Sequence, residues 1–509
     1  MTNKKAYITT AIPYVNGTPH IGNALDYLIA DIWARYQKQN SKEVRFQVGT
    51  DEHGNKIAAK AAEAGLTPQA YTDKMYGNFE ALMRKIGAEF TDFIRTTNPH
   101  HEKAVQYIWQ KLQPYIYKGT YQGWYCQGCE SFVTDKEANA NNGTCPDHHT
   151  QYQLLSEENY YLKTSAFTDA LRTAMEKRKF EIIPEFRKKE FLELIKDGLK
   201  DVSISRPKKN LSWGVPVPGD ESQVMYVWID ALANYITVLG YPENEDWKNY
   251  WPADVQVIGK DILRFHAGIW PAMLLGLGLA LPKKLLVHGF INVDGSKMSK
   301  TVGNIVDPNE IVDHYGVDAF RYFFSRHIPT QDDGDFTWET FEHAYNDELA
   351  NELGNLVQRV GAMSMKYLSG VIGDVPQPEH DTRLYHEHMK NLEFNKAFDE
   401  IWNNVRALNS YIENVKPWVI AKQAEQEPEA KAHLEEVLAY MAGALIQIGD
   451  LLIPFLPTTA QKIHDMFTTG VVRMPETGPL FPRLYIKTTD PRGVLEKNLP
   501  IQEAPSQVA

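Results

Sequence analysis

The chain has 509 residues, 43% of them hydrophobic, which is enough to bury the cores of two or three packed domains. It contains no run of about 18 or more apolar residues, and its first residues lack the long apolar stretch and cleavage site of a signal peptide, so we expect a cytoplasmic protein. The net charge of −12 gives a nucleic-acid partner no support, although local basic clusters leave one open.

The first 50 residues alternate between strand-like and helix-like patterns. An apolar run at 7–11 predicts a strand, apolar residues at helical spacing predict a helix over 21–32, and a second apolar run at 44–48 predicts another strand. This order implies a right-handed crossover in a parallel sheet, whose ligands bind beyond the carboxyl ends of the strands. We therefore expect functional loops after Ala11 and Val48.

The loop after the first predicted strand carries two prolines and two glycines and runs into the first predicted helix. A helix N-terminus favours phosphate, and His20 can donate to phosphate oxygens as negative charge develops. Gly22 would leave room for an adenine ring. The alternative is an ordinary strand-to-helix turn with a hydrogen-bonded histidine.

The parallel-sheet pattern breaks between about 115 and 225, which we interpret as an insertion. All three cysteines of the chain lie in its first part: Cys126 and Cys129 are followed by Cys145 and His148, and each pair has a two-residue spacer. Two such turns can close a tetrahedron around one structural zinc ion. A redox Cys-x-x-Cys motif would leave Cys145 and His148 unexplained, and His149 is an alternative ligand.

The sheet pattern returns with apolar runs at 255–258 and 285–287, and a helix is predicted between them over 262–277. A Lys-Met-Ser-Lys-Thr segment, 297–301, follows the strand pattern that ends at Phe290. Two lysines in a loop of small residues suit a mobile triphosphate clamp, in which Lys300 neutralises charge in the transition state and Lys297 holds the phosphates. A solvated run of charges is the alternative. We expect this loop and the His20 loop to lie on strands of one sheet.

Beyond about residue 345 the sequence is typical of helices throughout. Apolar residues between Phe394 and Val415 recur at alternating steps of four and three, and Pro417 ends the run. This pattern predicts a helical bundle domain.

The segments around His20 and Lys297 resemble the two signature motifs of class I aminoacyl-tRNA synthetases. Two positions depart from the usual form: Asn23 stands in place of a histidine in the first motif, and Thr301 in place of a serine in the second. The threonine is conservative, whereas the asparagine can form hydrogen bonds but cannot carry charge. The resemblance implies ATP binding, with Mg²⁺, by His20, Gly22, Asn23, Lys297 and Lys300.

Three further segments, 50–54, 226–231 and 259–266, resemble the methionyl branch of this class. By this resemblance the methionine pocket would consist of Ile12, Tyr14, Trp228, Ala231, Tyr235, Ile262 and His266, with Asp51 binding the ammonium group. Apolar and aromatic walls suit a flexible thioether. Gly259 and Asp261 would bind the ATP ribose. Core packing is the alternative for Trp228, Tyr235 and Ile262.

The resemblance also implies an anticodon site in the helical region. Asn355 and Arg359 are one helical turn apart, and Trp418 follows Pro417, where its ring can stack on a splayed base. The alternative is that Trp418 covers the bundle core. The implied reaction forms methionyl-adenylate and pyrophosphate from methionine and ATP, then transfers methionine to the 3′-terminal adenosine of tRNA(Met) for translation initiation and elongation.

The expected architecture is an α/β class I catalytic domain with a Rossmann-like parallel sheet and a zinc-bearing insertion, followed by an all-α domain. The expected divisions are a catalytic first half at 1–114, the insertion at 115–225, a catalytic second half at 226–325, a linking segment at 326–345 and a helical anticodon-binding domain at 346–509. We expect a monomer, because no additional C-terminal dimerisation domain is evident.

Three rival interpretations stay open on the sequence. A synthetase for leucine, isoleucine or valine would carry a longer editing insertion, and a smaller nucleotidyltransferase would not need the helical domain. A non-enzymatic RNA-binding paralogue is the third, and Asn23 is its best support. Exchange of pyrophosphate into ATP, measured with each amino acid, separates all three.

Overall fold

The computed structural model describes residues 4–128, 131–133, 135–298, 303–376, 381–476 and 478–484. The chain divides into two compact units. The first contains Met1–Pro19, Asn40–Arg84 and Ala88–His288, and the second contains His20–Gln39, Lys85–Gly87 and Gly289–Ala509. Within the described ranges, no helix is both long and apolar enough to cross a membrane.

The first unit is built on a six-stranded sheet with the order β3-β2-β1-β12-β13-β7, and every neighbouring pair is parallel. Its strands are β1 (Lys4–Thr10), β2 (Lys42–Thr50), β3 (Asp92–Arg95), β7 (Glu181–Ile183), β12 (Val255–Gly259) and β13 (Lys284–His288). The predicted strands at 7–11, 44–48, 255–258 and 285–287 are confirmed to within a few residues. The strand order reverses between β1 and β12, so the loops that follow these strands meet at the switch point where such sheets bind ligands.

The helices of the first unit include several that carry site residues or core contacts. They are α2 (Asn55–Glu63), α3 (Pro68–Lys85), α4 (Pro99–Lys111), α6 (Thr168–Glu176), α7 (Glu185–Leu194), α8 (Val227–Thr237), α9 (Trp247–Tyr250) and α10 (Trp270–Gly276). The helix predicted over 262–277 is found as a short 3₁₀ turn, a π-helical turn at Phe265–Ile269 and α10.

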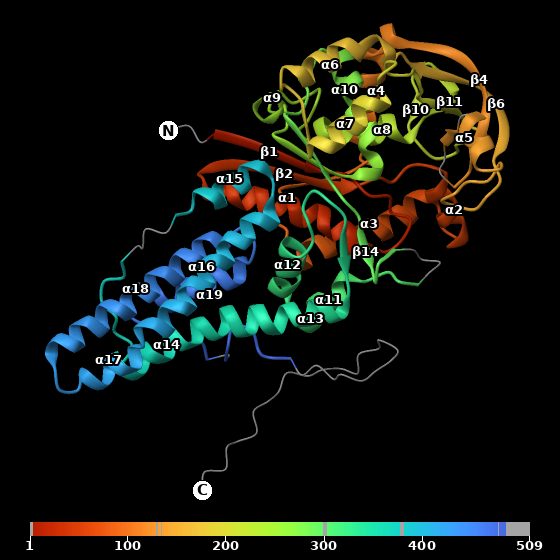
Figure 1. The fold of residues 1–509 in the computed structure, drawn as a ribbon. Coiled ribbons are helices and arrows are strands. Elements are labelled where there is room, and N and C mark those ends of the chain that lie inside the picture. The colour runs from red at the N-terminus through yellow and green to blue at the C-terminus, as the bar shows by residue number, and fades with distance from the viewer. Residues whose placement is uncertain are drawn as a thin grey trace. The chain divides into compact units, whose positions relative to one another are not determined.

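The predicted insertion contributes two antiparallel sheets to the first unit (Figure 1). The larger has the order β5-β4-β6-β8 and consists of β4 (Ile116–Cys126), β5 (Ser131–Val133), β6 (Gln153–Leu162) and β8 (Val202–Ser203). Helix α5 (Asp135–Ala140) follows β5. The smaller has the order β10-β11-β9, from β9 (Ser205–Pro207), β10 (Pro216–Val217) and β11 (Asp220–Met225).

The second unit is mainly helical. Its helices are α1 (Ile21–Gln39), α11 (Pro308–Tyr315), α12 (Val317–Arg326), α13 (Trp338–His343), α14 (Asn355–Leu368), α15 (Arg383–Asn391), α16 (Phe394–Val415), α17 (Pro417–Gln423), α18 (Pro428–Leu452) and α19 (Pro457–Phe467), with a π-helical segment at Ala344–Gly354. Helix α18 packs against α14, α16, α17 and α19, forming the bundle in Figure 1. Helix α16 has the bounds that its apolar period predicts, and the helical domain is confirmed.

A buried charge joins α1 to this bundle. The guanidinium of Arg321 on α12 is fully buried, 2.7 Å from the carboxylate of Asp31 on α1. It also donates to the carbonyls of Pro454 and Phe455, between α18 and α19, at 2.9 and 2.6 Å. A buried charge is tolerated only when such partners replace water. The contact therefore ties three parts of the second unit together.

Candidate functional site

The start of helix α1 holds the first predicted motif in a cap of side-chain hydrogen bonds. His20 precedes the helix, and its backbone N–H donates to the amide oxygen of Asn23 at 3.1 Å. The ring atom Nδ1 of His20 accepts from the backbone N–H of Gly22 at 3.1 Å. Since Nδ1 accepts, the neutral imidazole carries its proton on Nε2, the atom that can donate to a phosphate oxygen.

Gly22 has a steric reason to lack a side chain that the sequence did not indicate. A Cβ at this position would lie 2.9 Å from the His20 ring and 3.6 Å from the methyl carbon of Met298. The space beside Gly22 is thus used by the His20 ring, so any larger residue would displace it. Met298 therefore lies close to Gly22, so the start of the second motif is near the first motif within the second unit.

The second motif begins at Lys297, the last residue of β15 (Ser296–Lys297), which forms a hairpin with β14 (Ile291–Val293). This hairpin forms its own three-stranded sheet with β16 (Gly334–Phe336), so the prediction that both motif loops follow strands of one sheet is wrong. Strand β13 ends at His288, and the chain enters the separate sheet after Gly289. The backbone of Asp332 approaches Gly289 so closely that a Cβ there would lie 2.3 Å from it.

The ammonium group of Lys297 lies 5.4 Å from the ring centre of Phe290. The carbonyl of Lys297 accepts from the side chain of Asn304 at 3.2 Å, which anchors the hairpin to the next loop. Lys300 and Thr301 lie outside the described residues.

The loop after β12 brings Gly259 and Asp261 together. A Cβ on Gly259 would lie 2.8 Å from a carboxylate oxygen of Asp261 and 3.8 Å from the ring of His288. Glycine at position 259 therefore allows the exposed carboxylate of Asp261 to fold back over the end of the strand.

The loops after β1 and β2 are joined through Tyr14 and Asp51. These residues form a parallel bridge, in which the N–H of Asp51 donates to the carbonyl of Pro13 at 2.9 Å and the N–H of Val15 donates to the carbonyl of Asp51 at 3.3 Å. Asp51 is buried, 5% exposed. Ile12 packs near Gly49 of β2, at 3.1 Å from where a Cβ on that glycine would lie.

A neutral polar pair lies between α8 and the π-helical turn. The hydroxyl of Tyr235 and Nε2 of His266 are 2.7 Å apart, and Nδ1 of His266 is 3.1 Å from the carbonyl of Ile262. Burial lowers the pKa of His266 to about 4, so the ring is uncharged near neutral pH. Because Nδ1 must donate to the carbonyl, Nε2 accepts from Tyr235. The Tyr235 hydroxyl and the His266 ring are therefore uncharged polar groups within a wall of aromatic side chains.

Trp228 stacks on Phe265 with ring centres 3.7 Å apart and planes 8° apart, and it meets the ring of His266 edge-on at 6.3 Å. Ala231, one turn further along α8, is buried. Phe265 lies inside the segment 259–266, but the sequence indicates no role for it. The structure thus brings Trp228, Tyr235, Ile262 and His266 together from three elements: α8, the 3₁₀ turn and the π-helical turn.

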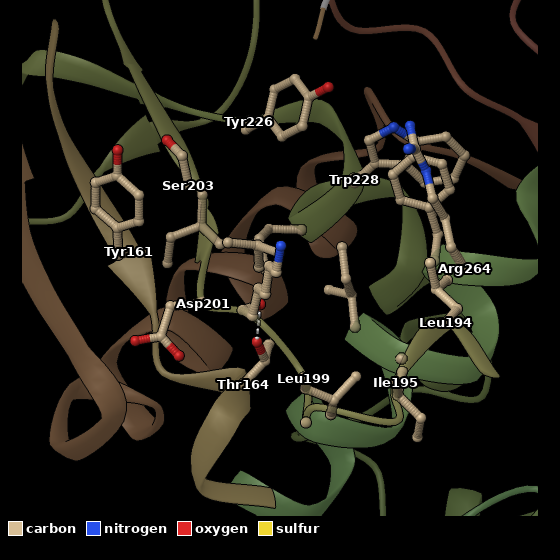
Figure 2. Close-up of a pocket in the computed structure, with 18 of the residues that line it drawn as sticks. Tyr161, Thr164, Leu194, Ile195, Leu199, Asp201, Ser203, Tyr226, Trp228 and Arg264 are labelled. Atoms are coloured by element: carbon tan, nitrogen blue, oxygen red, sulfur yellow. Dashed lines mark hydrogen bonds between the residues drawn. The ribbon is translucent and has the colours of Figure 1, made fainter. Parts of the chain in front are cut away.

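The Trp228–Phe265 stack also borders a cavity of about 430 Å³. Figure 2 shows this cavity, with Trp228 and Arg264 at one side and Tyr161 and Asp201 at the other. The guanidinium of Arg264 lies 4.7 Å from the Phe265 ring centre, and that of Arg206 lies 4.3 Å from the Tyr226 ring centre. Charged groups at the cavity wall are therefore supported on aromatic faces.

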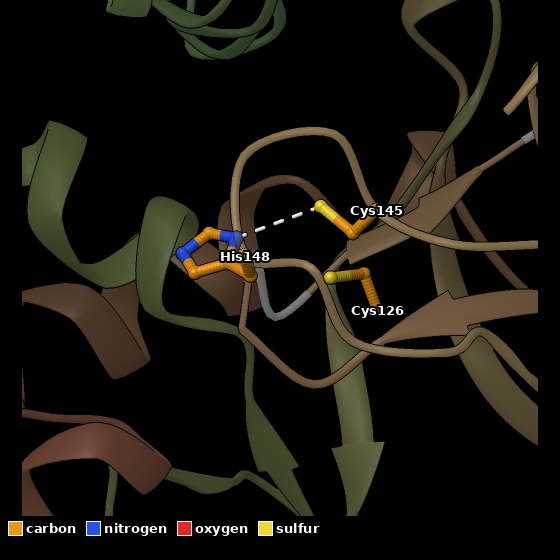
Figure 3. A group of neighbouring side chains, drawn as sticks. All are labelled: Cys126, Cys145 and His148. Carbon is orange, nitrogen blue, oxygen red and sulfur yellow. Dashed lines mark hydrogen bonds between the residues drawn. The ribbon is translucent and has the colours of Figure 1, made fainter.

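Cys126, Cys145 and His148 form a cluster that can hold a metal ion (Figure 3), and one ligand atom from each lies within 4.8 Å of the others. The sulfur of Cys145 is 3.6 Å from Nδ1 of His148. Gly128 must lack a side chain here, because a Cβ would lie 2.4 Å from the His148 ring. Cys129 lies outside the described residues, and the cluster contains His148 rather than His149.

The residues of the predicted anticodon site lie in the second unit on α14 and α17, which pack against each other. Asn355 is exposed, and Trp418 is partly exposed at the start of α17. The guanidinium of Arg359 pairs with Glu413 of α16 at 2.6 Å, both side chains being partly exposed. An ion pair in this setting contributes about 1 kcal/mol or less, so Arg359 can exchange it for another anion.

Two family profiles cover most of the chain. Residues 6–155 and 149–361 match the family described as tRNA synthetases class I (M), and residues 376–479 match the anticodon binding domain of methionyl tRNA ligase.

Curated relatives and solved structures agree with these profiles. The methionine–tRNA ligase of Caldanaerobacter subterraneus subsp. tengcongensis is 43% identical over 91% of this chain and 74% of its own length, and that of Clostridium tetani is 42% identical over 92% and 75%. The structure is similar to Mycobacterium tuberculosis methionyl-tRNA synthetase in complex with methionyl-adenylate, with a TM-score of 0.87 and 35% identity over 94% of this chain and 100% of that one.

The parallel sheet with its switch-point loops, the two motifs and the helical domain define a class I aminoacyl-tRNA synthetase. Within that class, identity of about 40% over most of the chain settles the branch. The chain belongs to the methionine–tRNA ligases, the enzymes that activate methionine with ATP and attach it to transfer RNA.

Proposed function

We propose that this chain binds methionine between the loops after β1 and β2 and helix α8, and forms methionyl-adenylate there. The observation that carries the proposal is the uncharged Tyr235–His266 pair beside the Trp228–Phe265 stack. A thioether is apolar and polarizable, so aromatic walls with an uncharged polar edge suit it. The remaining proposed contacts are Asp51 with the ammonium group, and Ile12, Tyr14, Ala231 and Ile262 as pocket walls.

The test is methionine-dependent exchange of pyrophosphate into ATP. We expect exchange with methionine and none with leucine or isoleucine at the same concentration. Exchange driven by leucine or isoleucine would overturn the choice of substrate, and a complete lack of exchange would favour a non-enzymatic paralogue.

The residues proposed to contact ATP, which is accompanied by Mg²⁺, belong to the two signature motifs and to the loop after β12. His20 would donate from Nε2 to phosphate, Gly22 and Asn23 keep that ring and the helix start in place, and Lys297 and Lys300 would neutralise the phosphates. Gly259 and Asp261 would bind the ribose, since a carboxylate accepts hydrogen bonds from both sugar hydroxyls.

The metal is proposed to be one structural zinc ion, held by Cys126, Cys129, Cys145 and His148. We expect Cys145→Ala to lose the metal, because three ligands would be left where a closed structural site needs four. Metal analysis of the purified protein measures this. His149→Ala is the control and should retain a full equivalent of zinc. A full equivalent in Cys145→Ala would refute the ligand set.

Selection of tRNA(Met) is proposed to depend on Asn355, Arg359 and Trp418. Base stacking on an aromatic ring contributes ~1–3 kcal/mol, so Trp418→Ala should lower aminoacylation by about 10- to 100-fold and leave pyrophosphate exchange intact. The exposed neighbour Val419, replaced by alanine, is the control. Equal losses in both assays with a lower melting temperature would mean that Trp418 is structural. We also propose that the enzyme transfers methionine to the 3′-terminal adenosine of tRNA(Met) and that it works in the cytoplasm.

A further inference from the structure

A buried carboxylate lies on α8 between the proposed pocket residues Trp228 and Ala231. Asp230 is 1% exposed, and each of its oxygens contacts a different histidine. One oxygen is 2.6 Å from Nδ1 of His53, and the other is 2.8 Å from Nε2 of His101. Both oxygens of this buried group are therefore paired within the protein.

The contact is between charged groups. Burial acts to lower the pKa of His53, but the neighbouring carboxylate of Asp230 outweighs it and raises the pKa to about 10. Burial acts to raise the pKa of Asp230, and the charge of His53 with hydrogen bonds from both histidines brings it to about 2. At neutral pH His53 is thus positive and Asp230 negative. Removal of Asp230 would leave the buried charge of His53 with only the partly exposed carboxylate of Glu102, 3.5 Å from Nε2.

This ion pair connects the two sides of the proposed amino-acid site. His53 follows Asp51 by two residues, and the backbone of Asp51 is bridged to Tyr14. Asp230 belongs to α8, which carries Trp228, Ala231 and Tyr235. The pair therefore links the carboxylate proposed to hold the ammonium group to the helix proposed to hold the side chain.

Other contacts tie α8 to the sheet further from the site. The side chain of Gln47 on β2 donates to Asn234 at 2.8 Å, and the hydroxyl of Tyr7 on β1 donates to the carbonyl of Tyr235 at 2.8 Å. Behind Asp230, Nδ1 of His101 meets the hydroxyl of Thr237 at 2.7 Å. Of these contacts between α8 and the rest of the first unit, only that of His53 reaches the loop that contains Asp51.

We propose that His53 is a positioning residue, which acts through Asp230, and that His101 supports Asp230 from the other side. The pair sets the spacing between Asp51 and the pocket walls on α8, and so determines which length of amino-acid side chain the site accepts. This inference rests on the proposed methionine site. Neither histidine needs to touch the substrate for this role.

The test is methionine-dependent pyrophosphate exchange with His53→Gln and Asp230→Asn. A displacement of about 1 Å in a binding site can cost about 100-fold, so we expect KM for methionine to rise about 10- to 100-fold. The KM for ATP should be unchanged, and the preference for methionine over leucine should fall. Because the two residues act as a pair, the double variant should have the same KM for methionine as either single variant.

The control for general destabilisation is Leu171→Ala, a fully buried position on α6. It should lower the melting temperature and leave KM for methionine unchanged. If His53→Gln raises that KM no more than Leu171→Ala does, or if the two single effects multiply in the double variant, the positioning role is overturned. An unaltered protein without methionine-dependent exchange would overturn the proposed function as well, so the two failures are distinguishable.

Discussion

Replacement of Trp228 by alanine is expected to weaken methionine binding about 30- to 1000-fold. The estimate follows from the loss of an aromatic anchor, which typically costs ~2–4 kcal/mol, converted at 1.4 kcal/mol per factor of ten. Trp228 covers Phe265 at 3.7 Å and the edge of the His266 ring, so its removal would let water into the aromatic wall. Methionine affinity, measured by titration of pyrophosphate exchange, checks the prediction.

Trp228→Phe is the matched control, because phenylalanine can preserve the stack on Phe265. It should retain most of the affinity for methionine. Unchanged affinity in Trp228→Ala, together with a lower melting temperature, would show that the ring belongs to the core and not to the binding site.

His20→Ala should slow adenylate formation by about 10²- to 10³-fold and change ATP affinity much less. This is the usual cost of removing one donor that acts where charge develops in the transition state. The hydrogen bond from Gly22 to Nδ1 places the donor proton on Nε2, and that donor is lost with the ring. Single-turnover formation of methionyl-adenylate separates the rate from ATP binding.

Asn23 offers the comparison within the same motif. Its amide oxygen accepts from the N–H of His20, so Asn23→Ala should cost about 1 kcal/mol of stability, the usual net contribution of one hydrogen bond. Asn23→His restores the residue usual in the family and can also accept at that N–H. A large gain in rate with histidine would show that the asparagine limits phosphate stabilisation. If His20→Ala lowered only the apparent ATP affinity, the transition-state role would be refuted.

Much of this architecture could be predicted because its signals are local. The bounds of α16 follow from its apolar period and from Pro417, which begins the next helix. The four longer strands of the main sheet, β1, β2, β12 and β13, are rich in apolar residues. By contrast, β7 is only three residues long and lies in turn-rich sequence, where a run that short cannot be distinguished from a loop.

The features that the sequence did not predict are those that depend on contacts between residues far apart in the chain. The apolar run that ends at Phe290 has the pattern of one strand, but close approach of Asp332 to Gly289 separates β13 from β14. Similarly, nothing local indicates that His53 pairs with Asp230, 177 residues further along. The His-x-Gly spacing indicates that the His20 ring can lie near Gly22, but only the helix geometry shows that the ring nitrogen accepts from the Gly22 N–H.

The contacts of Arg321 limit how the catalytic part and the helical bundle could have been combined in evolution. Arg321 on α12 and Asp31 on α1 belong to the catalytic sequence, whereas the carbonyls of Pro454 and Phe455 belong to the bundle. A gene encoding only the first part would leave the guanidinium of Arg321 without its two carbonyl acceptors. The bundle is therefore not an interchangeable module: a recombination event that replaced it would take two hydrogen-bond acceptors away from Arg321 and destabilise the protein, which favours inheritance of α1 and the bundle together.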